Sequence, residues 1–468
     1  QGLSPRDAAE QTIARLEGAF ALAFLFDGED DLIIGARKGS PLAVGYGDGE
    51  MFLGSDAIAL SGMTDRITYL EEGDRVILTR EGAEIFDAKG RRANRAVKTI
   101  QLDATRIEKA GHKHFMAKEI AEQPTVVADA LAHYLAEDGS LRLPRDLDFS
   151  RFDRIVMVAC GTAHYACLTA RYWFEALAEL PVDIDVASEF RYREPPIGPN
   201  TLAIFVSQSG ETADTLAALR YCEAKAMTLA VVNVSESSIA READLSLPIL
   251  AGAEIGVAST KAFTCQLTVL ALLALAAAEA RGTMSTEALA AARVAFRAVP
   301  GLIAQALAAE DQISAVSQEL AKARDILFLG RGAMYPLAME GALKLKEISY
   351  IHAEGYASGE LKHGPIALID PAVPVIVMAP HDALFDKTVS NMQEVMARGG
   401  KVVLITDSEG AARASDGTWR VIQMPAVADL FAPILYAVPA QLLAYHTAVA
   451  KGTDVDQPRN LAKSVTVE

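Results

Sequence analysis

Three short turns rich in hydroxyl side chains could bind a phosphate group. The richest is "SQSGET" (207–212), where Ser207, Ser209 and Thr212 carry hydroxyls and Gly210 lets the backbone approach a ligand. It separates an apolar run, typical of a buried strand, from a segment with apolar residues at helical spacing. A helix that starts after a parallel strand presents free N–H groups to an anion. The sequence therefore predicts a phosphate-binding turn here.

The other two turns are "CGTA" (160–163) and "VAST" (257–260). Serine and threonine at a helix start are also common caps that need no ligand, so one such turn alone would not favour binding. None of the three turns has the Gly-Lys-Ser/Thr ending of a Walker loop or the glycine spacing of a dinucleotide fingerprint. The phosphate prediction therefore depends on the presence of three hydroxyl-rich turns in one region.

A second group of candidate residues is titratable and lies in 340–365. Lys344 and Glu347 are three residues apart and share one helix face, which usually indicates a surface ion pair. The surrounding sequence is apolar, however. Within a few turns come His352, Glu354, Glu360, Lys362 and His363. A carboxylate base and a histidine of tunable pKa suit proton transfer at a carbon next to a carbonyl, although His352 alone is predicted to be structural.

The C-terminal segment 451–468 contains Arg459 and Lys463 on a stretch of low helix propensity. Its composition alone favours a solvated terminus. A lysine that entered a closed cleft would instead lose its water and could act as an amine nucleophile toward a ketone.

Two kinds of element must position these residues. Up to about residue 98, short β-like runs alternate with Asp/Gly turns and predict antiparallel sheet. After a polar helical segment (112–135), apolar strands alternate with helical patterns, which indicates doubly wound parallel α/β sheets. The expected strands are 154–159, 182–187, 201–206, 228–234, 325–330, 373–380 and 401–408.

The α/β pattern occurs twice along the chain. "RIVMVACGTAHYACLTARYWFE" and "DILFLGRGAMYPLAMEGALKLKE" both place a glycine-containing polar turn between a strand and a helix. Gly161 and Gly332 correspond in this comparison and lie 171 residues apart. The sequence therefore predicts two tandem copies of one domain.

Composition excludes several classes of protein. The 468 residues carry a formal charge of −17 without a segregated basic patch, so nucleic acid is not an expected partner. The apolar run 262–278 is interrupted by polar residues and predicts a buried helix, not a membrane span. The cysteines lie in apolar settings without paired spacing and are expected to be reduced, as in a cytoplasmic protein: Cys160, Cys167, Cys222 and Cys265.

Several of these segments together resemble the glucosamine-6-phosphate synthases, the isomerizing glutamine:fructose-6-phosphate aminotransferases. They are "CGTA", "SQSGETADT", "EIGVASTKAFTCQLTVL", "GALKLKEISYIHAEGYASGELKHGP" and "KGTDVDQPRNLAKSVTVE". The resemblance implies formation of glucosamine 6-phosphate from fructose 6-phosphate and glutamine-derived ammonia, by a homodimer without metal or cofactor. It implies an α/β fold with five segments: part of a glutaminase domain (1–98), a linker (99–110), two sugar isomerase domains (111–288 and 289–450) and an active-site tail (451–468).

The resemblance also assigns site residues. It implies phosphate contacts from Ser207, Gln208, Ser209 and Thr212, and sugar contacts from Thr162, Val257, Ser259 and Ala462. Lys463 resembles the lysine that forms an imine with the open-chain ketose, and Glu347 the base that moves a proton between C1 and C2, with Lys344 close to the same sugar. His363 resembles the ring-opening histidine, which in this family reaches in from the neighbouring subunit.

The sequence departs from the family in two places. Ala163 stands where some relatives carry a second hydroxyl, and residues 1–98 resemble only the second half of the glutaminase domain. The family nucleophile is an N-terminal cysteine, whereas this sequence begins with Gln1 and its first cysteine is Cys160. The sequence as given is therefore expected to isomerise sugar phosphate without hydrolysing glutamine, and residues before Gln1 are expected in the natural protein.

Two other functions are consistent with parts of the sequence. A regulatory sugar-phosphate sensor would need the hydroxyl-rich turns but not Glu347, His363 and Lys463, so their joint presence favours an enzyme. A plain aldose–ketose isomerase would leave the β-rich N-terminal segment and the C-terminal tail without a role.

Overall fold

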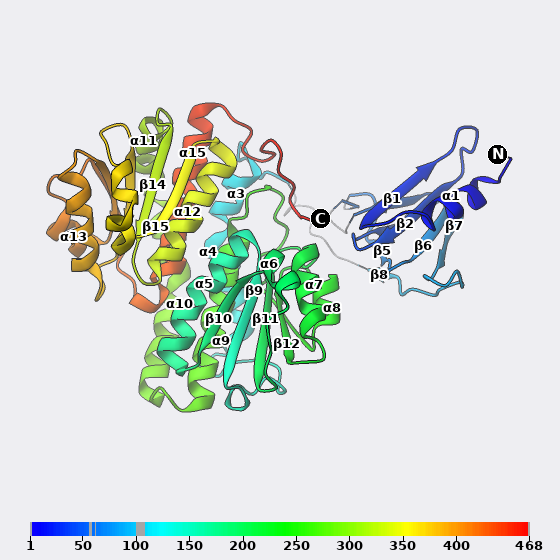
Figure 1. Cartoon of the computed structure of the whole chain (residues 1–468), viewed down its shortest axis with the longest axis horizontal. Coiled ribbons are helices and arrows are strands. Elements are labelled where there is room, and N and C mark those ends of the chain that lie inside the picture. Colours follow the sequence, from blue (N-terminus) through cyan, green and yellow to red (C-terminus); the bar gives the residue numbers. More distant parts are fainter. Residues whose placement is uncertain (1, 56–58, 61, 100–107, 467–468) are drawn as a thin grey trace. The chain divides into compact units, whose positions relative to one another are not determined.

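The computed structural model describes residues 2–55, 59–60, 62–99 and 108–466 (Figure 1). The chain divides into two compact units. The smaller one comprises Gln1–Ala110 with Glu211–Leu216 and Ser464–Glu468, and the larger one comprises Gly111–Gly210 and Ala217–Lys463. Most of the expected linker, residues 100–107, lies outside the described residues.

The smaller unit contains two antiparallel sheets, which confirms the prediction for this region. One has the strand order β1 (Phe20–Leu25), β2 (Ile33–Lys38), β6 (Arg75–Thr79) and β7 (Gly82–Phe86). The other has the order β4 (Met51–Gly54), β3 (Ala43–Tyr46), β5 (Arg66–Tyr69) and β8 (Lys98–Thr99). Val44, Val76 and Leu78 belong to its buried apolar cluster. Helix α1 (Pro5–Ile13) starts at Ser4, whose hydroxyl accepts the Asp7 N–H.

The larger unit contains two five-stranded parallel sheets with the same connectivity. The first has the order β10 (Val182–Val186), β9 (Arg154–Ala159), β11 (Thr201–Ser207), β12 (Met227–Val232) and β13 (Leu245–Pro248). The second has the order β15 (His352–Ala357), β14 (Asp325–Gly330), β16 (Pro374–Met378), β17 (Lys401–Thr406) and β18 (Arg420–Gln423). The predicted strands are confirmed within two residues at each end.

The matching strand orders confirm the tandem repeat. Gly161 follows β9 and Gly332 follows β14, with φ of +54° and +53°. Both glycines thus adopt the left-handed conformation that other residues rarely take, at the same turn of the two copies.

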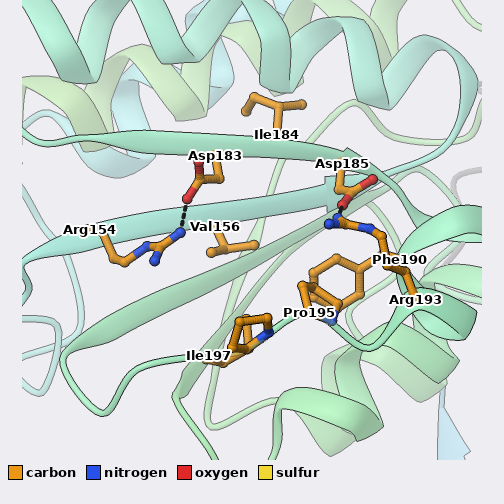
Figure 2. A pocket seen from close by; sticks show the side chains of 10 residues that line it. Arg154, Val156, Asp183, Ile184, Asp185, Phe190, Arg193, Pro195 and Ile197 are labelled. Carbon is orange, nitrogen blue, oxygen red and sulfur yellow. Dashed lines mark hydrogen bonds and ion pairs between the residues drawn. The ribbon is translucent and has the colours of Figure 1, made fainter.

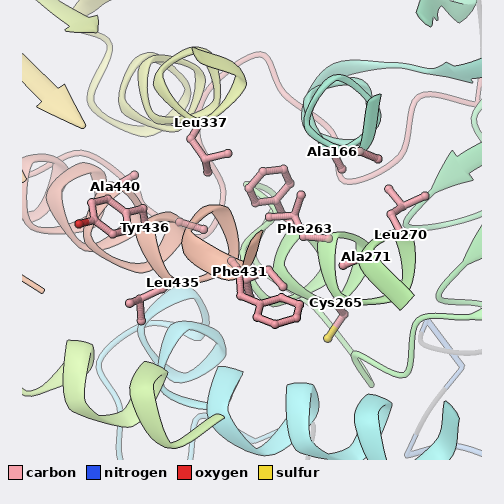
Figure 3. Close-up of a cluster of buried hydrophobic side chains, with 14 of the residues drawn as sticks. Ala166, Phe263, Cys265, Leu270, Ala271, Leu337, Phe431, Leu435, Tyr436 and Ala440 are labelled. Carbon is pink, nitrogen blue, oxygen red and sulfur yellow. The ribbon is translucent and has the colours of Figure 1, made fainter. Parts of the chain in front are cut away.

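Helices of both copies meet in one apolar core. Helices α5 (Gly161–Ala178) and α9 (Lys261–Arg281) of the first copy pack together, as do α12 (Met334–Ser349) and α15 (Ala432–Lys451) of the second, and α12 also contacts α5. Figure 3 shows side chains of this core from α9 (Phe263), α12 (Leu337) and α15 (Tyr436). The shared core fixes the two copies relative to each other, so a site can be built from both.

The remaining helices follow residue 110 in the chain. They are α3 (Phe115–Ala121), α4 (Gln123–Tyr134), α6 (Ala187–Arg193), α7 (Ala213–Cys222), α8 (Ser238–Glu242), α10 (Thr286–Leu307), α11 (Glu310–Leu320), α13 (Phe385–Met396) and α14 (Ser408–Ala414). Helix α7 is divided between the two units after Leu216. Among the described residues, α9 is the one helix long and apolar enough to cross a membrane, and 89% of its most apolar stretch is buried inside the protein. This burial agrees with the predicted core helix.

Candidate active site

The turn after β11 is held in shape by its own hydroxyl and by Gly210. Ser207 Oγ accepts the Gly210 N–H at 3.0 Å, so this buried serine closes the turn three residues before α7 begins. Gly210 has φ of +66°, and a Cβ there would lie 1.9 Å from Ser237 Oγ, so no larger residue fits. The carbonyl of Gln208 accepts the Asn233 N–H at 3.2 Å. Gln208 and Ser209 are half-buried beside this fixed backbone.

Thr212 ends the same turn, immediately before α7. Its carbonyl accepts the Leu216 N–H at 2.9 Å, and its side chain is half-buried. The α7 N-terminus therefore follows the turn directly, as the strand–turn–helix prediction requires.

The "CGTA" turn connects the two copies. Thr162 lies in the first turn of α5, and its hydroxyl donates to Glu340 Oε1 of α12 at 3.2 Å. Ala163 points into the apolar core and is 9% exposed. The predicted sugar contact Thr162 is thus attached to the helix that carries the titratable residues.

Helix α12 presents a buried lysine between two carboxylates. Lys344 Nζ lies 2.5 Å from Glu347 Oε2 and 3.6 Å from Glu340 Oε1. Burial raises the pKa of Glu340 to about 8. Burial alone would lower the pKa of Lys344, but the charges of Glu340 and Glu347 outweigh it and raise that pKa above its usual value. Lys344 therefore stays an ammonium, and Glu340 can retain a proton at neutral pH.

The C-terminal tail is anchored to the larger unit at residues 455–458 and again at Lys463, so the solvated terminus favoured by composition is wrong there, whereas residues 459–462 are exposed. Val455 is fully buried. The carboxylate of Asp456 accepts the Phe115 and Met116 N–H groups at the start of α3, and its carbonyl accepts the Val257 N–H at 3.0 Å. These contacts bring the following residues toward the loop before α9.

The ammonium group of Lys463 binds to the loop that precedes α9. Its Nζ lies 2.6 Å from Glu254 Oε2 and 2.8 Å from the Gly256 carbonyl oxygen. Val257 and Ser259, predicted sugar contacts, belong to this loop and are half-buried, whereas Ala462 beside the lysine is exposed. The structure therefore brings Lys463 together with the third hydroxyl-rich turn.

Glu254 is buried, and both of its carboxylate oxygens accept hydrogen bonds. Its Oε1 accepts the Thr260 and Ala262 N–H groups at 2.9 and 3.0 Å, and its Oε2 accepts the Ser259 hydroxyl at 3.0 Å. Burial acts to raise the pKa of Glu254, but the Lys463 ammonium and these hydrogen bonds outweigh it and lower that pKa. Glu254 is thus a buried carboxylate anion facing the lysine.

The family comparison agrees with this architecture. A model of the SIS domain matches residues 148–276 and 319–451, one match for each parallel sheet. The chain is 59% identical over 471 residues to the glutamine–fructose-6-phosphate aminotransferase (isomerizing) of Brucella abortus biovar 1, covering 100% of this chain and 78% of that relative. It is 60% identical over 472 residues, with the same coverage, to the protein of that name from Bradyrhizobium diazoefficiens. The chain belongs to the isomerizing glutamine–fructose-6-phosphate aminotransferase family.

A solved structure supports the same assignment. The C-terminal domain of glucosamine-fructose-6-phosphate aminotransferase from Francisella tularensis is 44% identical, with a TM-score of 0.73. The match covers 75% of this chain and 100% of that one. This coverage is what the two SIS domains of an aminotransferase of this family would give.

Two histidines of this aminotransferase chain lie apart from the buried clusters. His363 is exposed at the end of the short helix η2 (Ser358–His363). His352 is exposed at the start of β15, and its Nδ1 lies 2.9 Å from Asp325 Oδ1. Among the described residues, no hydrogen bond or ion pair joins His363 to Glu347, and His352 makes a surface hydrogen bond to Asp325.

Two carboxylates of the buried clusters were missed from the sequence. Glu340 precedes Lys344 by four residues, a spacing that places both on one helix face and could have indicated it. Glu254 lies in a loop, 209 residues from its partner Lys463, and gave no such signal.

A separate pocket of about 310 Å³ lies on the first sheet (Figure 2). Arg154 and Asp183 form one ion pair on its wall, and Arg193 and Asp185 form another. Its other lining residues are Val156, Ile184, Phe190, Pro195, Pro196 and Ile197. Both arginines are neutralised and no predicted site residue lines this pocket, so we assign it no role.

Proposed function

We propose that this chain converts fructose 6-phosphate and ammonia into glucosamine 6-phosphate and acts in the cytoplasm without metal or organic cofactor. Membership of the aminotransferase family supports this proposal. The observation that carries it is the buried Glu340–Lys344–Glu347 cluster, which Thr162 reaches from the other SIS domain. A sensor domain would need the hydroxyl-rich turns, but it would have no need for a buried lysine between two carboxylates.

The substrate is proposed to lie between the hydroxyl-rich turns and α12. Ser207, Gln208, Ser209 and Thr212 would bind the phosphate. The turn supports this role because its backbone is fixed by Gly210 before any ligand arrives. Thr162, Val257, Ser259 and Ala462 would contact the sugar.

The proposed chemistry divides between Lys463 and Glu347. The amine of Lys463 would form an imine with the open-chain ketone, and the imine makes the neighbouring C–H more acidic. The Glu347 carboxylate could then move the proton between C1 and C2. Lys344, 2.5 Å from Glu347, would hold that carboxylate in place and stabilise negative charge on the sugar.

His363 would open the sugar ring in the site of a neighbouring subunit. Its exposure is consistent with such a role and with a homodimer. We also propose the domain limits expected from the sequence: 1–98, 99–110, 111–288, 289–450 and 451–468.

The test is to incubate the chain with fructose 6-phosphate and either ammonium or glutamine, and to measure glucosamine 6-phosphate and glucose 6-phosphate. Glucosamine 6-phosphate from ammonium supports the proposal, and the glutamine arm tests whether this chain uses glutamine as well. Glucose 6-phosphate alone would indicate a plain isomerase. Binding of fructose 6-phosphate without either product would overturn the proposal in favour of a sugar-phosphate sensor.

A further inference from the structure

A second buried carboxylate, Glu119 of α3, supports the loop that holds Lys463. Its Oε1 accepts the Ile255 and Gly256 N–H groups, the latter at 3.1 Å. These are the two residues after Glu254, and the Gly256 carbonyl is one of the two acceptors for Lys463 Nζ. Glu119 therefore fixes the backbone that forms half of the lysine's binding site.

The other oxygen of Glu119 is left without a partner. Glu119 is 2% exposed, and its Oε2 has no hydrogen-bond partner among the described residues. A Cβ on Gly256 would lie 2.9 Å from this oxygen, so only glycine leaves room for it. A buried carboxylate oxygen without a donor is costly, and structural support of the loop would need Oε1 alone.

Two buried carboxylates thus contact the loop that binds one lysine. Glu254 is stabilised as an anion by four donors, including Lys463. Burial and the charge of Glu254 raise the pKa of Glu119 to about 7. Glu119 consequently gains or loses a proton near neutral pH, while Glu254 remains charged.

Other charged groups near Glu119 are already engaged. Lys118 and Lys261 both pair with Glu122 at the end of α3, at 3.4 and 2.7 Å. Asp456 binds backbone N–H groups at the start of α3. Lys344, influenced by Glu254 from α12, is held between Glu340 and Glu347. The charge of Glu254 raises the pKa of Glu119, and the charge of Lys463 lowers it.

We propose that Glu119 is a positioning residue for Lys463, which holds the Glu254–Gly256 loop in place and sets the charge beneath the lysine. This inference rests on the proposed imine chemistry. With Glu119 ionised, two negative charges lie at the loop that binds Lys463. With Glu119 neutral, only the Glu254 charge remains there.

Imine formation at Lys463 conserves protons and charge. The Lys463 ammonium, whose side chain is 26% exposed, gives one proton to solvent, and the nitrogen lone pair then forms a bond to C2 of the ketose. The carbonyl oxygen takes one proton from that nitrogen and one from solvent, and it leaves as water. Lys463 ends as a protonated imine opposite Glu254, which stays ionised throughout, so net charge is conserved.

The test is Glu119→Gln, which keeps an acceptor oxygen for the loop but cannot ionise. Each protein is incubated with fructose 6-phosphate from pH 6 to pH 9, the imine is reduced with borohydride, and the adduct on Lys463 is measured by mass spectrometry. We expect the pH of half-maximal trapping to fall by about one unit in the variant, because a negative charge near the ammonium is gone. Asp129→Asn removes an exposed charge from α4 and should leave that pH unchanged.

A second variant covers the case in which Glu119→Gln does not fold. Gly256→Ala places a methyl group against Glu119 Oε2 and should displace the carboxylate, moving the trapping pH in the same direction. Unchanged trapping pH in both folded variants would overturn the role of Glu119. Absence of any Lys463 adduct in the unmodified protein would instead overturn the imine chemistry of the proposed function.

Discussion

The ammonium nitrogen of Lys344 lies 2.5 Å from Glu347 Oε2, three residues further along α12. The side chain of Lys344 is 1% exposed. Lys322 and Glu319 form a pair at the same three-residue separation in sequence, but that lysine side chain is 71% exposed. Burial removes water as an alternative partner, so the two pairs should differ strongly in energetic importance.

Lys344→Met is expected to lower the free energy of unfolding by about 3 kcal/mol, because it leaves the Glu340 and Glu347 carboxyls without their cation. Lys322→Met should change it by less than about 0.5 kcal/mol. Urea unfolding monitored by circular dichroism measures both. Equal effects of the two substitutions would show that the buried pair has no special importance.

Glu347→Gln is expected to lower the rate of isomerisation by about 10²–10⁴-fold, because an amide cannot accept the proton from C1. The affinity for fructose 6-phosphate should not change, since the substitution does not alter the proposed phosphate-binding turn (207–212). Turnover and calorimetric binding are measured on the same preparation, with Glu319→Gln as a control. Weakened binding with normal turnover would contradict the role of Glu347 as the base.

Most of the larger unit could be predicted from the sequence. The strands of a parallel sheet are buried on both faces, so each one is an apolar run such as 154–159 or 325–330. The polar segment 112–135 was predicted as one helix, but it forms two, with the break at Glu122 before Pro124. Proline near a helix start is compatible with a new helix and removes a donor from a continuous one.

The site was predicted less completely than the fold. Lys344 and Glu347 were found because neighbours on one helix face are neighbours in sequence. Glu254 could not be found in this way, since its role depends on Lys463 at the far end of the chain. His352 alone was predicted to be structural, and it makes an exposed hydrogen bond to Asp325.

Gly210→Ala is expected to weaken binding of fructose 6-phosphate by at least about tenfold, because the new Cβ would lie 1.9 Å from Ser237 Oγ and must displace the phosphate turn. Gly282 is a matched control with the same φ of +66° and open space around it. Gly282→Ala should cost about 1 kcal/mol of stability without changing affinity. Calorimetric titration with fructose 6-phosphate measures the affinity of both variants. Equal affinities would contradict the proposal that a rigid turn at 207–212 binds the phosphate.

Glu340→Gln is expected to flatten the dependence of stability on pH. The pKa of Glu340 is raised from 4.5 to about 8 in the folded protein, so its retained proton stabilises the fold below about pH 4.5. That contribution to the free energy of unfolding is lost as the pH rises toward 8, by at most about 1.4 kcal/mol per pH unit. Urea midpoints at pH 5, 6, 7 and 8 measure the slope. Glu319→Gln should keep the slope of the unmodified protein, and an identical slope for Glu340→Gln would contradict burial of an uncharged Glu340.

Mixed dimers test whether His363 acts in the neighbouring subunit's site. Glu347→Gln and His363→Ala are each expected to be nearly inactive alone. In a dimer with one chain of each kind, one site would combine both lesions, while the other would combine a native Glu347 with a native His363 from its neighbour. Random association of two co-expressed variants should then restore about a quarter of the activity per site. If His363 served its own chain, every site in the mixture would carry one lesion and no activity would return.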